Sequence, residues 1–224
     1  LNVVSLSNSG RKISELFALH ETSLTGLLQE QIEKTKSDDP QFEYFISQII
    51  IAGMNYDELG FEKYFAASVL RYGMKNTYTN IIYPVLIRTG LIWSKSEMCP
   101  AQEHFLSNLI QQKIHAAIDG TTTPSKRNKC WLLFLPEGET HEIGLLFANF
   151  LIRSAGQKTI YLGSNVPFDS LKESINNIQP TDLLFFFTTN RSEKDAQNYL
   201  DDLFKFNSKP SIHVAGNKRI IEQL

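Results

Sequence analysis

Apolar residues in the first half of the chain recur at the spacing of helices. From residue 40 to about residue 120, they stand three and four positions apart in successive segments. Pro40 suits the first turn of a helix, with Asp38 or Asp39 as its cap. Breaks are expected at residues 55–57, at Gly73 and at Gly90, with the last two helices over residues 77–88 and 100–118. This pattern predicts an up-and-down four-helix bundle over residues 37–120.

The pattern then changes to short apolar runs that alternate with helical segments. A polar linker is expected over residues 121–128. Strands are predicted over residues 130–135, 158–162, 182–188 and 211–214, and helices over residues 143–154, 168–177 and 193–206. This order predicts a Rossmann-like α/β domain over residues 129–224, with a parallel sheet covered on both faces. The run 183–187 is expected as a central strand buried on both sides, and the last crossover is expected to continue past Leu224.

Composition narrows the classes of function. With 224 residues, 42% hydrophobic residues and a net charge of -2, the chain can bury a core but offers no basic surface typical of a nucleic-acid reader. It has no apolar run of ~18 residues and no secretory signal, which indicates a cytoplasmic protein without a membrane partner. Its two cysteines, Cys99 and Cys130, suggest neither a disulfide framework nor a thiolate metal site.

The stretch from Pro136 to Gly144 lies between the first predicted strand and the helix after it. His141 therefore falls at the carboxyl end of a parallel strand, the edge at which open α/β sheets bind ligands. Glu139 can accept the imidazole proton, fix its tautomer and raise its basicity as a metal ligand. Gly144 allows the backbone or a bulky planar group to approach closely. A histidine that only caps the helix would produce the same local pattern.

This Glu-x-His-x-x-Gly motif resembles the Asp-x-His-x-x-Gly motif of cobalamin-binding domains, in the glutamate form found in cobalamin-dependent MerR-family regulators. The segment 161–167, which includes Val166, resembles the strand and loop that follow in that family. The resemblance implies that His141 is the lower axial ligand of cobalt and displaces the cofactor's own base into a slot lined by the sheet. Glu139 and Gly144 would then belong to the cofactor-binding site.

Two further positions match the slot for the nucleotide tail of the cofactor in this family. Thr188 stands where a Ser or Thr contacts the buried tail, and Gly216 stands in a glycine pair whose first member here is Ala215. The sequence departs from the family twice, because Thr188-Thr189-Asn190 replaces Ser-x-Leu and Ala215 adds a methyl group.

The predicted bundle holds a second match to the same family. Trp93 is followed by Glu103 and His104 at the spacing of the helical cap over cobalamin, which places them near the upper ligand, expected to be adenosyl. Taken singly, Trp93 is also compatible with a bundle core, and the other two with a solvated helix face. Light-sensing relatives can have a histidine after this tryptophan, whereas this chain has Ser94.

The resemblance implies a cobalamin-binding sensor and oligomerisation region of a transcriptional regulator, not an enzyme. Residues 1–36 resemble the end of a MerR-type winged helix-turn-helix and a connecting helix, so DNA would be bound through a missing N-terminal domain. A homo-oligomer, dimer or tetramer, is expected. The alternatives are a corrinoid-carrying methyl-transfer module and a regulator that has lost cobalamin binding. Hydrolase, phosphate-loop and zinc-protease motifs do not occur in the sequence.

Overall fold

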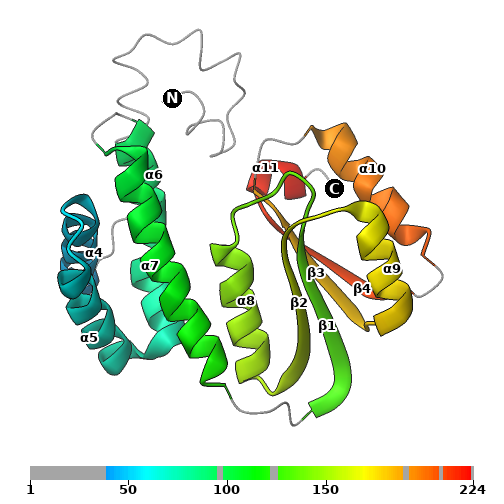
Figure 1. Ribbon diagram of the computed structural model, residues 1–224, viewed down its shortest axis with the longest axis horizontal. Helices are drawn as coiled ribbons and strands as arrows, with labels where there is room; N and C mark the ends of the chain where they lie inside the picture. The colour runs from blue at the N-terminus through cyan, green and yellow to red at the C-terminus, as the bar shows by residue number, and fades with distance from the viewer. Residues whose placement is uncertain (1–38, 95–97, 122–125, 189–191, 207–208, 223–224) are drawn as a thin grey trace, which may run out of the picture. The chain divides into compact units, whose positions relative to one another are not determined.

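The protein is described by a computed structural model that covers residues 39–94, 98–121, 126–188, 192–206 and 209–222. The chain forms two compact units, one extending to Lys113 and the other beginning at Ile114. The first unit contains α4 (Pro40–Met54), α5 (Glu58–Thr77), the π-helical turn η1 (Tyr78–Ile82), α6 (Tyr83–Ser94) and most of α7 (Pro100–Asp119) (Figure 1). Within the described ranges, every helix is too short or too polar to span a bilayer.

Caps and ion pairs fix the helices of the first unit. Asp39 caps α4 by accepting a hydrogen bond from the Gln41 amide, as the sequence predicts. The guanidinium of Arg88 in α6 donates two hydrogen bonds to Glu43 in α4, with N–O distances of 2.7 and 2.8 Å. Such a paired fork is a strong and geometrically specific contact, so it sets how α6 lies along α4.

The break expected at Gly73 is confirmed, because its backbone is non-helical, with φ of 75°, and forms a kink between two helical segments of α5. The helix end expected at Gly90 is wrong. Gly90 lies inside α6, which extends to Ser94. Its neighbours Thr89 and Leu91 are both buried, and this packing outweighs the cost of a helical glycine, roughly 1 kcal/mol.

The second unit is an α/β domain with a parallel sheet. Its elements are β1 (Lys126–Pro136), α8 (Ile143–Ser154), β2 (Gln157–Val166), α9 (Phe168–Ile178), β3 (Asp182–Phe187), α10 (Glu193–Phe204), β4 (Ser211–Gly216) and α11 (Lys218–Ile221). The strand order is β2-β1-β3-β4, and all three pairings are parallel. The predicted fold class is therefore confirmed, although β1 begins within the segment expected as a linker.

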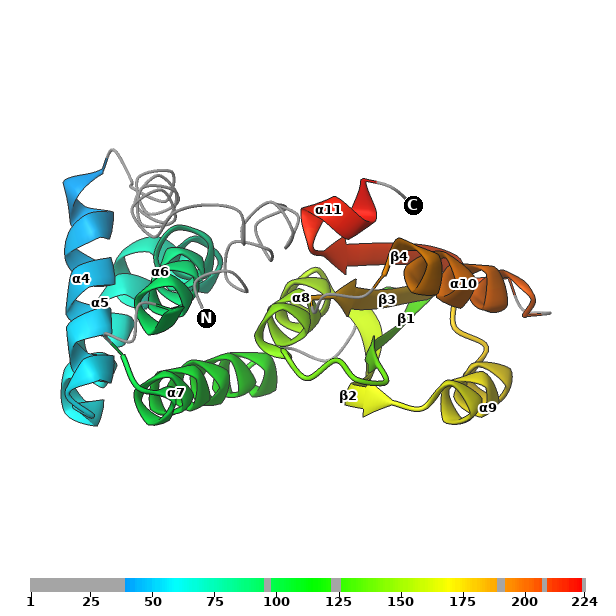
Figure 2. The ribbon, with the colours of Figure 1, turned by 90° about the horizontal axis from the view of Figure 1, so that it is seen from above.

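Helices cover both faces of this sheet. Figure 2 shows α8 on one side and α9 and α10 on the other. Leu132, Phe134 and Phe185 pack with α9 and α10 in the larger core, whereas Leu133 and Leu135 pack with α8. The expectation that 183–187 is buried on both sides is correct for one face only, because Leu184 and Phe186 on the α8 side are only partly buried.

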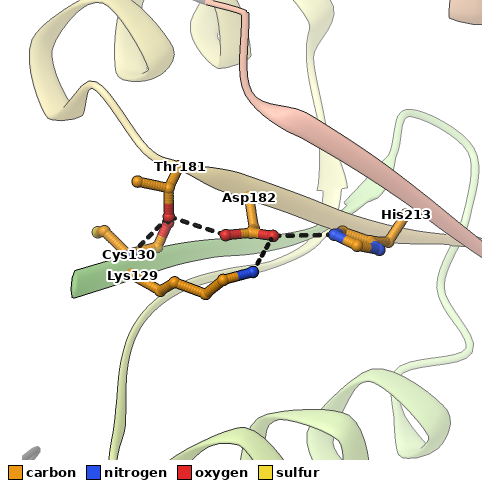
Figure 3. A network of polar contacts seen from close by, with 5 residues as sticks. All are labelled: Lys129, Cys130, Thr181, Asp182 and His213. Carbon is orange, nitrogen blue, oxygen red and sulfur yellow. Dashed lines mark hydrogen bonds and ion pairs between the residues drawn. The ribbon is translucent and has the colours of Figure 1, made fainter. Parts of the chain in front are cut away.

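A buried carboxylate ties three strands together at the amino-terminal edge of the sheet (Figure 3). Asp182, at the start of β3, accepts hydrogen bonds from Thr181 at 2.8 Å, from His213 of β4 at 2.9 Å and from Lys129 of β1 at 3.1 Å. The His213 ring lies against Trp131, with 4.8 Å between the ring centroids. Burial raises the pKa of the Asp182 carboxyl, but the bonds from His213, Thr181 and Lys129 outweigh it and leave that pKa below its usual value.

We expect Asp182→Asn to lower the free energy of unfolding of the α/β unit by about 1–3 kcal/mol, because an amide cannot accept from all three donors. Urea unfolding followed by Trp131 fluorescence, in a Trp93→Phe background, measures the change. The exposed Asp201→Asn is the control and should shift stability by no more than about 0.5 kcal/mol.

The same comparison should depend on pH in a defined direction. A carboxyl whose pKa is lowered on folding stabilises the protein above its unfolded pKa of about 3.9. This contribution is lost as the pH falls through the folded pKa. The stability difference between the wild type and Asp182→Asn should therefore be full at pH 6 and shrink below about pH 4; a constant difference would contradict this role.

Candidate functional site

The predicted histidine lies on the loop between β1 and α8. β1 ends at Pro136 and α8 begins at Ile143, so His141 stands at the carboxyl edge of the sheet, where it is exposed. Parallel pairing brings the end of β2 beside this loop, with Val166 opposite Pro136 in the register. The ends of β3 and β4, near Thr188 and Gly216, lie along the same edge. Residues far apart in sequence are thus gathered at the edge that binds ligands in open α/β sheets.

Glu139 is linked to His141 through Thr188. The Glu139 residue is fully buried, and its Oε2 accepts a hydrogen bond from the Thr188 hydroxyl at 2.5 Å. Its Oε1 accepts from the Thr188 backbone amide at 3.2 Å. The same threonine oxygen lies 3.4 Å from Nδ1 of His141. The carboxylate therefore acts on the imidazole through an intervening hydroxyl, a connection that residue spacing alone did not predict.

This chain of contacts favours one tautomer of His141. The Thr188 hydroxyl has one proton, and it donates that proton to Glu139. It is then left to accept from His141, and the 3.4 Å contact fits the tautomer that is protonated at Nδ1. Nε2 keeps its lone pair in that tautomer and is the nitrogen able to bind a metal.

The residue after His141 is held by the neighbouring strand. The Glu142 carboxylate lies 3.5 Å from the hydroxyl of Tyr161 in β2. Burial, the charge of Glu142 and this hydrogen bond together raise the pKa of Tyr161, so the phenol stays protonated and remains a donor. Glu142 also begins α8, because its carbonyl accepts from the Leu146 amide at 2.8 Å. The start of the helix is thereby tied to β2.

The two glycines of the predicted site each have a structural reason. A Cβ at Gly144 would stand 3.0 Å from the ring of Phe186, so the first turn of α8 packs tightly on β3. Gly216 has φ of 125°, and a Cβ there would stand 2.1 Å from the Phe187 carbonyl oxygen. Ala215, by contrast, pairs with Phe186 in regular strand geometry. At the end of β4, glycine is therefore required at position 216 and not at position 215.

The predicted residues of the helical unit are described in part. Glu103 and His104 lie in the first turn of α7, and Glu103 Oε2 is 3.0 Å from His104 Nδ1. The side chain of His104 is 73% exposed, so it is open to a ligand or solvent. Trp93 is part of α6, but its side chain lies outside the described residues, as do Thr189, Asn190 and residues 1–36.

A shallow pocket opens beside the histidine loop, on the side of α9 and α10. Its lining comprises Glu137, Phe168, Asp195, Asn198, Tyr199 and Asp202. None of the predicted site residues contributes to that lining. The hydrogen-bonded chain at Glu139 therefore identifies the candidate site by its chemistry.

Comparison with known proteins identifies transcriptional repressors as relatives. The HTH-type transcriptional repressor CarH of Myxococcus xanthus is 24% identical over 200 residues, which cover 88% of this chain and 66% of CarH. The repressor CarA of the same organism is 27% identical over 105 residues, covering 47% of this chain and 36% of CarA. The chain thus spans less than two thirds of the length of either repressor.

Comparison with solved structures supports the α/β fold described above. The monomethylamine corrinoid protein of Methanosarcina barkeri matches with a TM-score of 0.63 and 14% identity, over 81% of this chain and 95% of that protein. No protein-family model matches the chain. The resemblance to a family of regulators, inferred from the motif residues, is confirmed by the two repressors. The chain is accordingly a relative of transcriptional repressors, with the fold of a corrinoid protein.

Proposed function

We propose that the two units form the cobalamin-binding sensor region of a transcriptional regulator. The observation that carries this proposal is the hydrogen-bonded chain from buried Glu139 through Thr188 to His141. It leaves Nε2 of an exposed imidazole as a lone-pair donor at the ligand-binding edge of the sheet. The similarity to CarH along most of the chain supports a role in regulation rather than catalysis.

The single nitrogen that His141 offers fits a metal that already has most of its ligands when it binds. His141 offers one nitrogen, which suits a single axial position and not the three or four protein ligands of a free zinc ion. Bound cobalamin would supply a cobalt centre, and His141 would be the residue that holds it. Glu139 and Thr188 would orient the His141 imidazole, as hydrogen-bonded partners of metal-binding histidines do. Residues 129–224 are the proposed cofactor-binding domain.

We assign the remaining predicted residues to the rest of the cofactor. Val166, Thr188 and Gly216 lie at or beside the carboxyl ends of neighbouring strands, and we assign them to a slot for the nucleotide tail. The Thr188 hydroxyl is already engaged by Glu139 and His141, so we assign it mainly to orientation. In the helical unit, residues 37–120, Trp93, Glu103 and His104 are proposed to contact the upper ligand, an adenosyl group.

The regulatory part of the proposal follows from linkage. A cofactor whose affinity differs between two assembly states shifts the balance between those states, and no other device is required. We propose that the chain forms a homo-oligomer, a dimer or tetramer, whose assembly depends on the bound cofactor. DNA would be contacted by a preceding helix-turn-helix domain in the cytoplasm, in keeping with the description of CarH as an HTH-type repressor.

The second candidate is a corrinoid-carrying methyl-transfer module. The fold shared with the monomethylamine corrinoid protein favours it. Such a module would accept a methyl group from a partner methyltransferase, and its oligomeric state would not respond to the cofactor. Methylation by such a partner, combined with unchanged sedimentation, would favour this candidate over the sensor.

We expect the purified chain to bind adenosylcobalamin and to change its absorbance to that of a histidine-bound, base-off form. His141→Ala should remove this spectral change because the axial nitrogen is lost. His115→Ala alters an exposed histidine of α7 and is the matched control. A wild-type titration with excess cofactor that leaves the spectrum unchanged would sink the cofactor assignment.

Thr188 provides a sharper test of the hydrogen-bonded chain. Thr188→Val keeps the shape but removes the hydroxyl, so Glu139 loses a donor and His141 loses its contact with the carboxylate. We expect cobalamin affinity to fall about 10- to 100-fold, the usual effect of removing such a partner. Thr188→Ser retains the hydroxyl and should stay close to wild type. Equal affinity for the Val and Ser variants would contradict the orienting role.

A further inference from the structure

The loop that carries His141 is fastened to the end of β2 by one residue, Asn165. Its side-chain Oδ1 accepts a hydrogen bond from the Gly138 amide at 2.9 Å. Its own backbone amide donates to the Glu139 carbonyl at 3.0 Å. Two consecutive residues of the loop are therefore held by two groups of the same asparagine. Asn165 directly precedes Val166, which pairs with Pro136 at the end of the register between β1 and β2.

The backbone of Asn165 is in the left-handed region, with φ of 55°. Asparagine is one of the few residues other than glycine that enter this region readily. It also supplies a short side-chain acceptor, which glycine lacks. The position thus requires both a left-handed backbone and an acceptor, a combination that asparagine and aspartate satisfy.

We propose that Asn165 is a positioning residue for His141, an inference that rests on the proposed function of that histidine. Glu139 is held at its backbone amide by Pro136, at its carbonyl by Asn165 and at its carboxylate by Thr188. Removing the Asn165 side chain frees Gly138 and loosens the turn that places the carboxylate. Functional groups need placement within roughly 0.5 Å, so a loosened turn weakens the contact between Thr188 and His141.

Three substitutions separate this role from a purely conformational one. Asn165→Gly keeps the left-handed backbone and removes the acceptor, whereas Asn165→Asp keeps both. Gln179→Gly is the matched control, since Gln179 is also left-handed, with φ of 52°, but lies at the end of α9. A residue needed only for its backbone would tolerate glycine at position 165.

Two readouts are made on the full chain. In the cofactor-free protein, amide hydrogen exchange at Gly138 and the ring ¹⁵N shifts of His141 report the loop and its tautomer. With cobalamin added, absorbance gives the ratio of histidine-bound to histidine-free cofactor. We expect Asn165→Gly to speed exchange at Gly138, to reduce the share of the Nδ1–H tautomer and to lower the ratio about 2- to 10-fold, the effect of one lost hydrogen bond. Asn165→Asp and Gln179→Gly should match the wild type.

The outcomes distinguish this inference from the proposed function. Faster exchange in Asn165→Gly with an unchanged tautomer and an unchanged ratio would overturn the positioning role while leaving cobalamin binding intact. If the wild type itself shows no cobalamin spectrum, the proposed function fails, and the tautomer of the cofactor-free protein still decides the role of Asn165. An equal loss in Asn165→Asp would also overturn the inference, because the acceptor is retained there.

Discussion

A carboxylate removed from water must be hydrogen-bonded, and the arrangement around Glu139 follows from that requirement. Thr188 meets it with its amide and its hydroxyl, and because Thr188 directly follows β3, the bond joins the loop after β1 to the end of a neighbouring strand. The same hydroxyl reaches His141. Satisfying the buried carboxylate therefore also orients the exposed imidazole, and the polarisation of one bond strengthens the next.

One buried carboxylate lies at each end of β3, and the two have different roles. At the amino-terminal edge, Asp182 is paired with the cationic side chain of Lys129, with His213 and with a hydroxyl, so its charge is largely compensated within the fold. At the other edge, Glu139 is bonded to an amide and a hydroxyl that lead to an exposed histidine. The first arrangement holds strands together, and the second connects a buried carboxylate to an exposed imidazole, as the proposed metal-binding role of His141 requires.

Apolar periodicity was enough to predict the elements of the α/β unit. All four strands and the three main helices lie within a few residues of their expected bounds, because a buried parallel sheet requires nearly continuous apolar runs. Glycine was also taken as a helix break at Gly73 and Gly90, which is correct for the kink at Gly73 and wrong for Gly90, inside α6. Helix propensity at a single residue amounts to roughly 1 kcal/mol, and the packing of flanking buried side chains exceeds it.

The sequence by itself determined the spacing of Glu139, His141 and Gly144, and so placed His141, a candidate metal-binding residue, at the end of a strand. Tertiary structure alone decided how these residues are connected. Thr188 and Asn165 stand 47 and 24 positions after His141 in the numbering, and no local pattern relates them to it. They meet the loop because the order β2-β1-β3 places the carboxyl ends of three parallel strands side by side, which is a property of the sheet and not of any one segment.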